Sequence, residues 1–221
     1  MKYIILLSII CINILNAKLE EIDSNAKPKY YYMGLSAGPT FSNLRTNIDN
    51  IDIEMGTSYS LGYHLYQYLD KSKKHSLVSK VNISSRKVIF TVPDILDLTL
   101  PKKEYSEINR YFDISIAYKR EFLKFNKNSF YGIGGLYYSY LLESLGEENS
   151  SYITTKEYKS YDLGILAGLG YEIEFNSFIL GLEYSYMHGF VNKLDNDNSY
   201  LKNQTHLINF VFTMKHSFQK K

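Results

Sequence analysis

Apolar residues recur at every second position through most of this 221-residue chain, from Tyr30 almost to its end. Successive side chains of a β-strand point to opposite faces, whereas a helical face repeats every 3.6 residues, so the pattern predicts strands. Between residues 161 and 173 the odd positions are apolar or aromatic, and the even positions include Asp162, Glu172 and three glycines. Eight such segments can be counted. Seven have a clear apolar face, and the Gly- and Tyr-rich segment 130–142 gives no assignment of faces.

The connections between these segments alternate in length. The short connections are built from turn-forming residues at 70–73, 126–128 and 176–177. The long connections are expected at 42–56, 87–107, 143–160 and 191–203. Short turns on one side and long loops on the other are typical of an outer-membrane barrel. The chain is therefore predicted to be all-β, an eight-stranded antiparallel up-and-down transmembrane β-barrel.

Two barrel architectures compete, and the faces of the strands distinguish them. A soluble lipocalin-like barrel fills its interior with large apolar side chains and exposes a polar wall, whereas a membrane barrel turns the apolar face outward. The faces opposite the apolar ones carry Gly, Ser, Thr, Asn and isolated charges, which offer little bulk for a dry core. Strands of about 9 to 11 residues also suffice to cross the hydrocarbon layer. The membrane barrel is favoured.

Charged residues occupy several of the predicted inward positions. They are Lys80, Arg86, Asp113, Lys119, Asp162, Glu172 and Glu183. A charge inside a narrow barrel is costly unless it is paired. Position along the strands places Arg86 and Asp113 toward the extracellular end, and Lys119 and Glu172 toward the periplasmic end. We therefore predict lumenal ion pairs that plug the barrel.

Tyrosine is unusually abundant, with 22 residues, while tryptophan is absent. Aromatic rings with a polar tip favour the boundary between membrane and water, where they form girdles around a barrel. The predicted girdle consists of Tyr31, Tyr59, Tyr118, Tyr161, Tyr171, Phe178, Tyr186 and Phe218.

The N-terminus indicates export. Residues 1–17 combine a short positive start, an apolar core and a final Ala17, which is the pattern of a secretory signal peptide. The apolar run is too short for a membrane anchor, and Ile10 before Cys11 is unfavourable for a lipoprotein. Residues 18–29 are expected to form a flexible periplasmic leader and residues 30–218 the barrel. Because Cys11 is the only cysteine, no disulfide is expected in the exported chain.

No residue pattern predicts catalysis, a cofactor or a metal. A net charge of +2 without a long basic run argues against a nucleic-acid partner. Asp195–Ser199 begins like a calcium loop, but Tyr200 and His206 stand where Gly and Glu are required. The alternative of an outer-membrane hydrolase or acyltransferase would depend on His64, which faces inward, or on a carboxylate at the rim of the barrel. We expect no enzyme.

Several motifs occur in a familiar order. They are Tyr32–Leu44, Gly56–Tyr63, Tyr111–Ile116 with Tyr131–Gly135, Asp162–Tyr171 and the aromatic-ended close Asn203–Phe218. Together they resemble the outer membrane protein beta-barrel domain family, a group of porin-like small barrels common in bacteria related to Bacteroides. The resemblance implies a barrel fold and a location in the bacterial outer membrane, and it implies no assigned chemistry.

The expected function is therefore an integral outer-membrane barrel, with a structural or surface-interaction role exerted through extracellular loops. A narrow transport or secretion-accessory barrel is the alternative. The expected partners are outer-membrane lipid, the barrel-assembly machinery, which reads the aromatic-ended last strand, and an extracellular partner contacted by the loops. The protein is expected to be a monomer.

Overall fold

The computed structural model describes residues 31–48, 51–70, 72–92, 103–146, 159–194 and 199–216. Its strands are β1 (Tyr31–Thr46), β2 (Asp52–Tyr68), β3 (His75–Val92), β4 (Lys103–Phe125), β5 (Asn128–Gly146), β6 (Tyr161–Glu174), β7 (Phe178–Gly189) and β8 (Leu201–His216). The expected signal peptide and leader, residues 195–198 of the calcium-like run, and Phe218 lie outside the described residues. Within the described part of the chain, no helix is long and apolar enough to span a bilayer.

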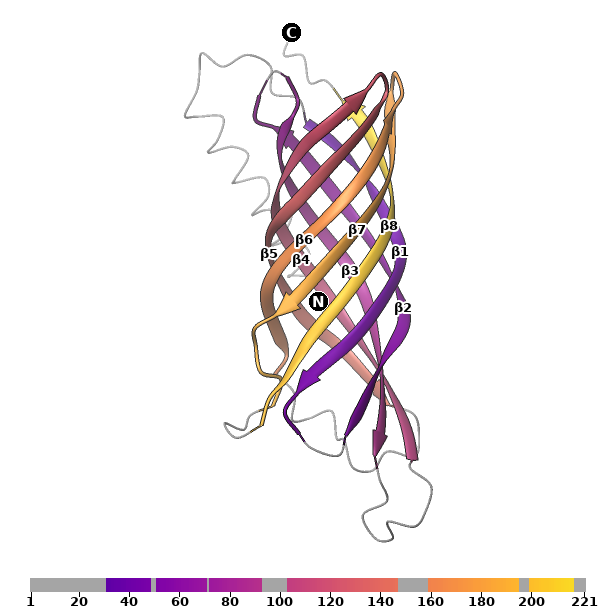
Figure 1. Cartoon of the computed structure of the whole chain (residues 1–221), viewed down its shortest axis with the longest axis vertical. Coiled ribbons are helices and arrows are strands. Elements are labelled where there is room, and N and C mark those ends of the chain that lie inside the picture. The colour runs from indigo at the N-terminus through magenta and orange to yellow at the C-terminus, as the bar shows by residue number, and fades with distance from the viewer. Residues whose placement is uncertain are drawn as a thin grey trace. The chain divides into compact units, whose positions relative to one another are not determined.

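Each strand pairs with its neighbours in sequence, antiparallel throughout, and β8 closes the barrel against β1 (Figure 1). The closing ladder runs from Tyr31 opposite His216 to Thr46 opposite Leu201. Full closure leaves no unpaired strand edge, which is required where no water is present to satisfy backbone groups. The prediction of an eight-stranded up-and-down barrel is confirmed.

Short and long connections lie at opposite ends of the barrel. We call the end where β2 meets β3, β4 meets β5 and β6 meets β7 the turn end, and the opposite end of the barrel the loop end. Asn126 has a φ of 53°, a left-handed conformation that Asn tolerates in a two-residue turn. In the β2–β3 turn, slight burial acts to raise the pKa of Asp70, but hydrogen bonds from the Ser72 hydroxyl and the His75 backbone N–H outweigh it and lower that pKa.

The exterior carries the apolar faces that the alternation predicts. Large exposed side chains include Leu35, Leu61, Ile83, Ile116, Leu136, Leu163, Leu182 and Phe210, with at least one on every strand. Inward positions are buried and include all seven of the predicted lumenal charges. In a soluble barrel this much exposed hydrocarbon would meet water at a cost of roughly 25 cal/mol per Å². The arrangement excludes the lipocalin-like alternative.

The strands extend farther toward the loop end than expected. β3 continues to Val92 and β4 begins at Lys103, so most of the expected loop 87–107 is strand, and the other long connections are also shorter than predicted. Apolar and polar residues alternate clearly only in the part of each strand whose outer face meets hydrocarbon, so the sequence predicts only that part as strand. Beyond that stretch the ladder persists, because backbone hydrogen bonds and the barrel closure maintain it without an apolar outer face.

The interior is less polar than expected. A first buried cluster runs through the barrel and includes Tyr66, Val78, Tyr131, Ile133, Leu166 and Met187. A second cluster at the loop end unites Leu44, Val88, Phe90 and Leu201. Eight strands leave an interior that side chains must fill, and glycine, serine and ionic groups alone do not supply the volume.

Candidate functional site

The charged interior of the barrel is the candidate site, and its seven predicted residues are all buried. They come together as three groups along the axis. The turn-end tier contains Lys119 and Glu172, the middle tier Lys80 and Glu183, and the loop-end tier Arg86, Asp113 and Asp162.

The turn-end tier joins β4 to β6 across the interior. Lys119 Nζ lies 2.6 Å from Glu172 Oε1. The same ammonium group lies 4.4 Å from the ring centroid of Tyr66 and 3.9 Å from that of Tyr131. A cation between two aromatic faces gains attraction from both ring quadrupoles, which compensates part of its lost hydration. Lys119 is therefore held from three sides.

The middle tier centres on Glu183 of β7, which is fully buried. Its carboxylate accepts hydrogen bonds from Lys80, from the Tyr131 hydroxyl at 3.0 Å and from the Ser185 hydroxyl at 2.9 Å. His64 lies in the interior as well, where its Nε2 is 2.8 Å from the Thr213 hydroxyl and its ring stacks on Tyr66. The carboxylate thus has three hydrogen-bond donors, and the ammonium group of Lys80 is the charged one among them.

The loop-end tier is built around Arg86 of β3. Its guanidinium donates to Asp113 at 2.6 Å and to the Ser139 hydroxyl at 2.9 Å, and it lies 4.0 Å from Asp162. The Tyr111 ring stacks on it at 4.2 Å. Arg86 Nε and Nη1 have no hydrogen-bond partner among the described protein atoms. This tier therefore has more polar atoms than protein partners.

Tyrosines complete the three tiers, and the sequence reasoning missed them. Hydroxyl groups of Tyr66, Tyr131 and Tyr137 donate to Glu172, Glu183 and Asp162, at 3.5, 3.0 and 3.0 Å respectively. Each of these three carboxylates thus accepts a hydrogen bond from one tyrosine hydroxyl. Tyr131 and Tyr137 belong to β5, the strand whose faces the sequence left unassigned. The abundance of tyrosine therefore serves the interior as well as the exterior.

Glycines on β6 make room for the two β5 rings. Gly170 is paired with Tyr131, and Gly164 with Tyr137. A Cβ atom on Gly170 would overlap the Tyr131 ring, and one on Gly164 would lie 2.7 Å from Tyr137 Cε1. A bulky residue directly opposite a glycine is the sequence signal for these tyrosines, but it becomes visible only once the register of β5 and β6 is known.

The predicted girdle residues lie on the exterior where the structure describes their side chains. Tyr59, Tyr118 and Tyr161 are exposed, and Tyr171, Phe178 and Tyr186 are half-buried. The side chain of Tyr31 is not described. Several rings find polar partners at the barrel surface: the Tyr171 hydroxyl donates to Asn128, and Tyr186 lies 3.0 Å from His188 Nδ1. Exposed rings missed by the prediction include Tyr63, Tyr138, Tyr140 and Tyr184.

The described residues contain no group of three or more His, Cys, Asp or Glu side chains that could hold a metal ion. The arrangement of the interior is that of paired charges whose donors and acceptors face one another. Its physical effect is to bind the strands together across the lumen, since β3 is joined to β7 and, through Arg86 and Asp162, to β6, and β4 is joined to β6.

Comparison with known proteins supports this architecture. A family profile described as the outer membrane protein beta-barrel domain matches residues 20–195. The crystal structure of the outer membrane protein OprG from Pseudomonas aeruginosa is similar, with 11% identity, a TM-score of 0.55, and coverage of 86% of this chain and 98% of OprG. Neisserial surface protein A aligns over 84% of this chain and 97% of its own, with 11% identity and a TM-score of 0.47. No match was found among curated proteins.

Proposed function

Since the chain belongs to the outer membrane protein beta-barrel family, and is thus a barrel of the bacterial outer membrane, we propose that it acts at the cell surface through its loop end, with a closed lumen. In this orientation the turn end faces the periplasm and the loop end faces outward. The barrel anchors the loop-end segments, and these segments contact a partner or a surface outside the cell.

The observation that carries the proposal is the series of buried ion pairs across the lumen. Three tiers occupy successive levels of the axis, and each contains a contact between strands that are not neighbours: β4 to β6 at the turn end, β3 to β7 in the middle, and β3 to β6, from Arg86 to Asp162 at 4.0 Å, at the loop end. At the loop end the apolar cluster of Leu44, Val88, Phe90 and Leu201 fills the interior as well. A solute would have to displace both kinds of packing.

The energetic cost of displacement supports closure. Separating one partner from a buried ion pair costs about 3–5 kcal/mol, because it leaves an uncompensated charge. A permeating solute would meet this cost at more than one level. Spontaneous opening of even one tier would therefore be populated in well under about 1% of molecules.

The loop end supports the second half of the proposal. Its connections span residues 47–51, 93–102, 147–160 and 190–200, whereas the turn end contains only short turns. β3 and β4 continue beyond the apolar part of the wall, so both strands extend outward past the membrane surface. Segments on a rigid scaffold are where binding residues concentrate.

Conductance in planar bilayers tests closure. We expect the full chain to insert without single-channel steps. A comparison variant replaces Lys119, Lys80 and Arg86 with serine, which removes the side chains that bridge the lumen. It tests whether the loop-end apolar cluster of Leu44, Val88, Phe90 and Leu201 alone keeps the lumen closed. Single-channel steps from the unsubstituted protein would overturn closure and favour a narrow transport or secretion-accessory barrel instead.

Cysteine labelling tests display at the surface. The background is Cys11→Ser, which has no other cysteine. Ser150→Cys, between β5 and β6, should react with a membrane-impermeant maleimide on intact cells. Ser72→Cys, at the turn end, should react only after the outer membrane is permeabilised. The reverse pattern would place the loop end in the periplasm and contradict the proposal.

A further inference from the structure

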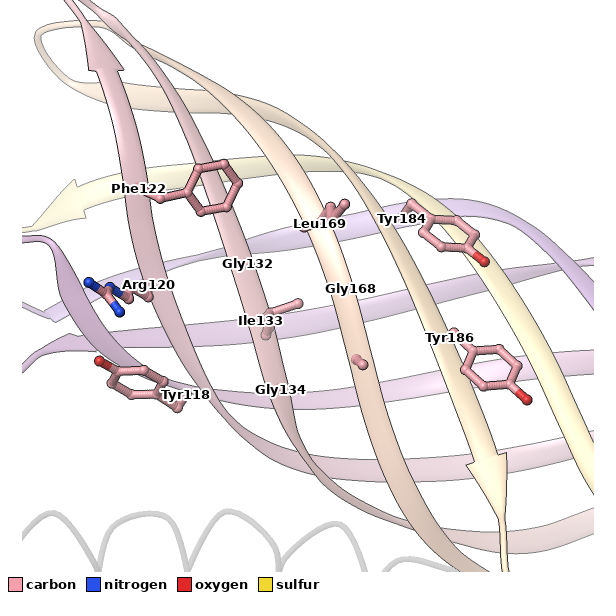
Figure 2. Close-up of a pocket in the computed structure, with 11 residues that line it drawn as sticks. Tyr118, Arg120, Phe122, Gly132, Ile133, Gly134, Gly168, Leu169, Tyr184 and Tyr186 are labelled. Atoms are coloured by element: carbon pink, nitrogen blue, oxygen red, sulfur yellow. The ribbon is translucent and has the colours of Figure 1, made fainter.

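The outer wall of the barrel is hollowed where β4, β5, β6 and β7 lie side by side. This exterior groove has a volume of about 580 Å³ and an almost wholly apolar lining. Figure 2 shows Gly132, Gly134 and Gly168 at its floor, with Phe122 on one side and Tyr184 and Tyr186 on the other. Its volume is within the range of roughly 300–1,000 Å³ that is usual for small-ligand sites.

The floor of the groove is recessed because its exterior positions carry glycine or alanine, whereas most other exterior positions of the wall carry large side chains. A Cβ on Gly134 would have no neighbour nearer than the Leu166 carbonyl oxygen at 4.0 Å, and one on Gly132 would have none nearer than Phe122 at 3.7 Å. Ala167 continues the floor on β6. These glycines differ from Gly164 and Gly170, whose missing side chains are replaced by tyrosine rings. Here no described side chain fills the space.

The raised sides of the groove come from both of its flanking strands. On β4 the pairing with β5 is irregular between Glu121 and Leu123, and this bulge leaves Phe122 and Leu123 both exposed on the exterior. On β7, Tyr184 and Tyr186 form the opposite side. The result is a trough bounded by aromatic rings, which suits a long, flexible, apolar occupant.

Arg120 gives the groove a charged end. It is exposed on β4 between Tyr118 and Phe122, on the face that otherwise meets hydrocarbon, and it belongs to the lining of the groove. The exterior Arg110 pairs with Glu143 at 2.8 Å, but no described carboxylate pairs with Arg120. A cation on the lipid face is destabilising, most of all at the midplane, so an anionic partner would stabilise it there.

The two ends of the groove lie at different depths. Arg120 is near the turn-end limit of β4 at Phe125, whereas Tyr186 is near the loop-end limit of β7 at Gly189. The end of the groove at Arg120 therefore lies in the periplasmic leaflet. The long arginine side chain can extend toward the periplasmic interface, where lipid phosphate groups lie.

We propose that this groove is a binding site for a phosphate-bearing lipid of the periplasmic leaflet. One acyl chain lies across Gly132, Gly134 and Ala167, and the phosphate is bound by Arg120. A guanidinium–phosphate contact is a strong charge-assisted interaction in a medium of low dielectric constant. The site requires only the outer-membrane location and does not depend on the proposed surface role.

A second copy of the chain fits the groove less well. Both copies insert in the same direction, so a dimer would be related by a two-fold axis along the membrane normal, with the same patch on each side. In such a dimer the grooves of the two copies would face each other, and neither copy would fill the groove of the other. An acyl chain fills the trough without this constraint.

The absence of tryptophan makes a direct test available. Leu136→Trp places a probe next to Gly134 on the exterior of β5, and Leu61→Trp places a matched control on β2. The two leucines are similarly exposed, at 61% and 59%. The full chain carrying either change is reconstituted in phosphatidylcholine vesicles that contain a small fraction of brominated phosphatidic acid, or of brominated diacylglycerol with the same chains. Bromine quenches the nearby indole on contact.

We expect phosphatidic acid to quench the Leu136→Trp protein at about tenfold lower mole fraction than diacylglycerol does, as one charge-assisted contact allows. The Leu61→Trp protein should not discriminate between the two lipids. Adding Arg120→Gln should remove the discrimination, and adding Gly134→Leu should weaken quenching by both lipids. If Gly134→Leu prevents folding, Ala167→Leu fills the same floor.

Equal quenching of the two probes by both lipids would overturn the proposal. A chemically cross-linked dimer that disappears with Gly134→Leu or Ala167→Leu would assign the groove to a second copy and would also overturn it. Folding of every variant is checked by the heat-dependent shift in gel mobility that a closed barrel gives.

Discussion

The Lys80–Glu183 pair offers the sharpest test of how the interior is held together. Both side chains are almost completely buried, with relative exposures of 6% and 1%. Glu183→Gln preserves shape and still accepts a hydrogen bond from Tyr131, but it leaves Lys80 charged and without its counter-ion. Because an unpaired buried charge is the dominant cost, we expect the free energy of unfolding to fall by about 3–5 kcal/mol.

The double variant Lys80→Met, Glu183→Gln separates this cost from simple loss of packing. With no charge left to bury, it should recover most of the lost stability, since replacing both members of a buried pair is often close to neutral. The exposed pair Arg110–Glu143, at 43% and 45% exposure, is the matched control. There Glu143→Gln should change stability by no more than about 1 kcal/mol.

The assay is urea unfolding of the barrel in lipid vesicles, with the folded fraction read from the heat-dependent gel mobility shift. The reasoning fails if Glu183→Gln costs no more than Glu143→Gln. It also fails if the double variant is less stable than Glu183→Gln alone, because the interior would then depend on shape rather than on charge balance.

Two further predictions concern the wall of the barrel. Leu35→Arg puts a cation on the exposed apolar exterior of β1. We expect the free energy of unfolding in lipid vesicles to fall by about 2–4 kcal/mol. A change within roughly 0.5 kcal/mol, the usual effect at a water-exposed site, would contradict a lipid-facing wall. Gly170→Leu would drive a side chain into the Tyr131 ring, and we expect about 1–3 kcal/mol of destabilisation from overpacking. Combining Gly170→Leu with Tyr131→Ala should restore part of it, and no recovery would refute the pairing of ring and glycine.

The alternation of apolar and polar residues determined strand count and order, and it determined facing in every segment but 130–142, because a period of two assigns each side chain to one of two faces. It placed Arg86 with Asp113, and Lys119 with Glu172, at opposite ends of the interior, and the structure brings each of these pairs to 2.6 Å. The sequence also indicated the short turns, since their residue types have intrinsic conformational preferences. These properties are local, so a single strand or turn is enough to read them.

Only the tertiary structure decided which residues meet across the barrel. Glu183 and Lys80 are 103 positions apart, and their contact depends on the closure of eight strands in one particular register. The roles of Tyr131 and Tyr137 depend on Gly170 and Gly164 of the neighbouring strand. The length of β3 and β4 beyond the apolar wall is likewise maintained by the ladder, not by a face pattern. A sequence records the preference of each side chain for one face, whereas register and closure are properties of the whole barrel and determine the partner that each side chain contacts.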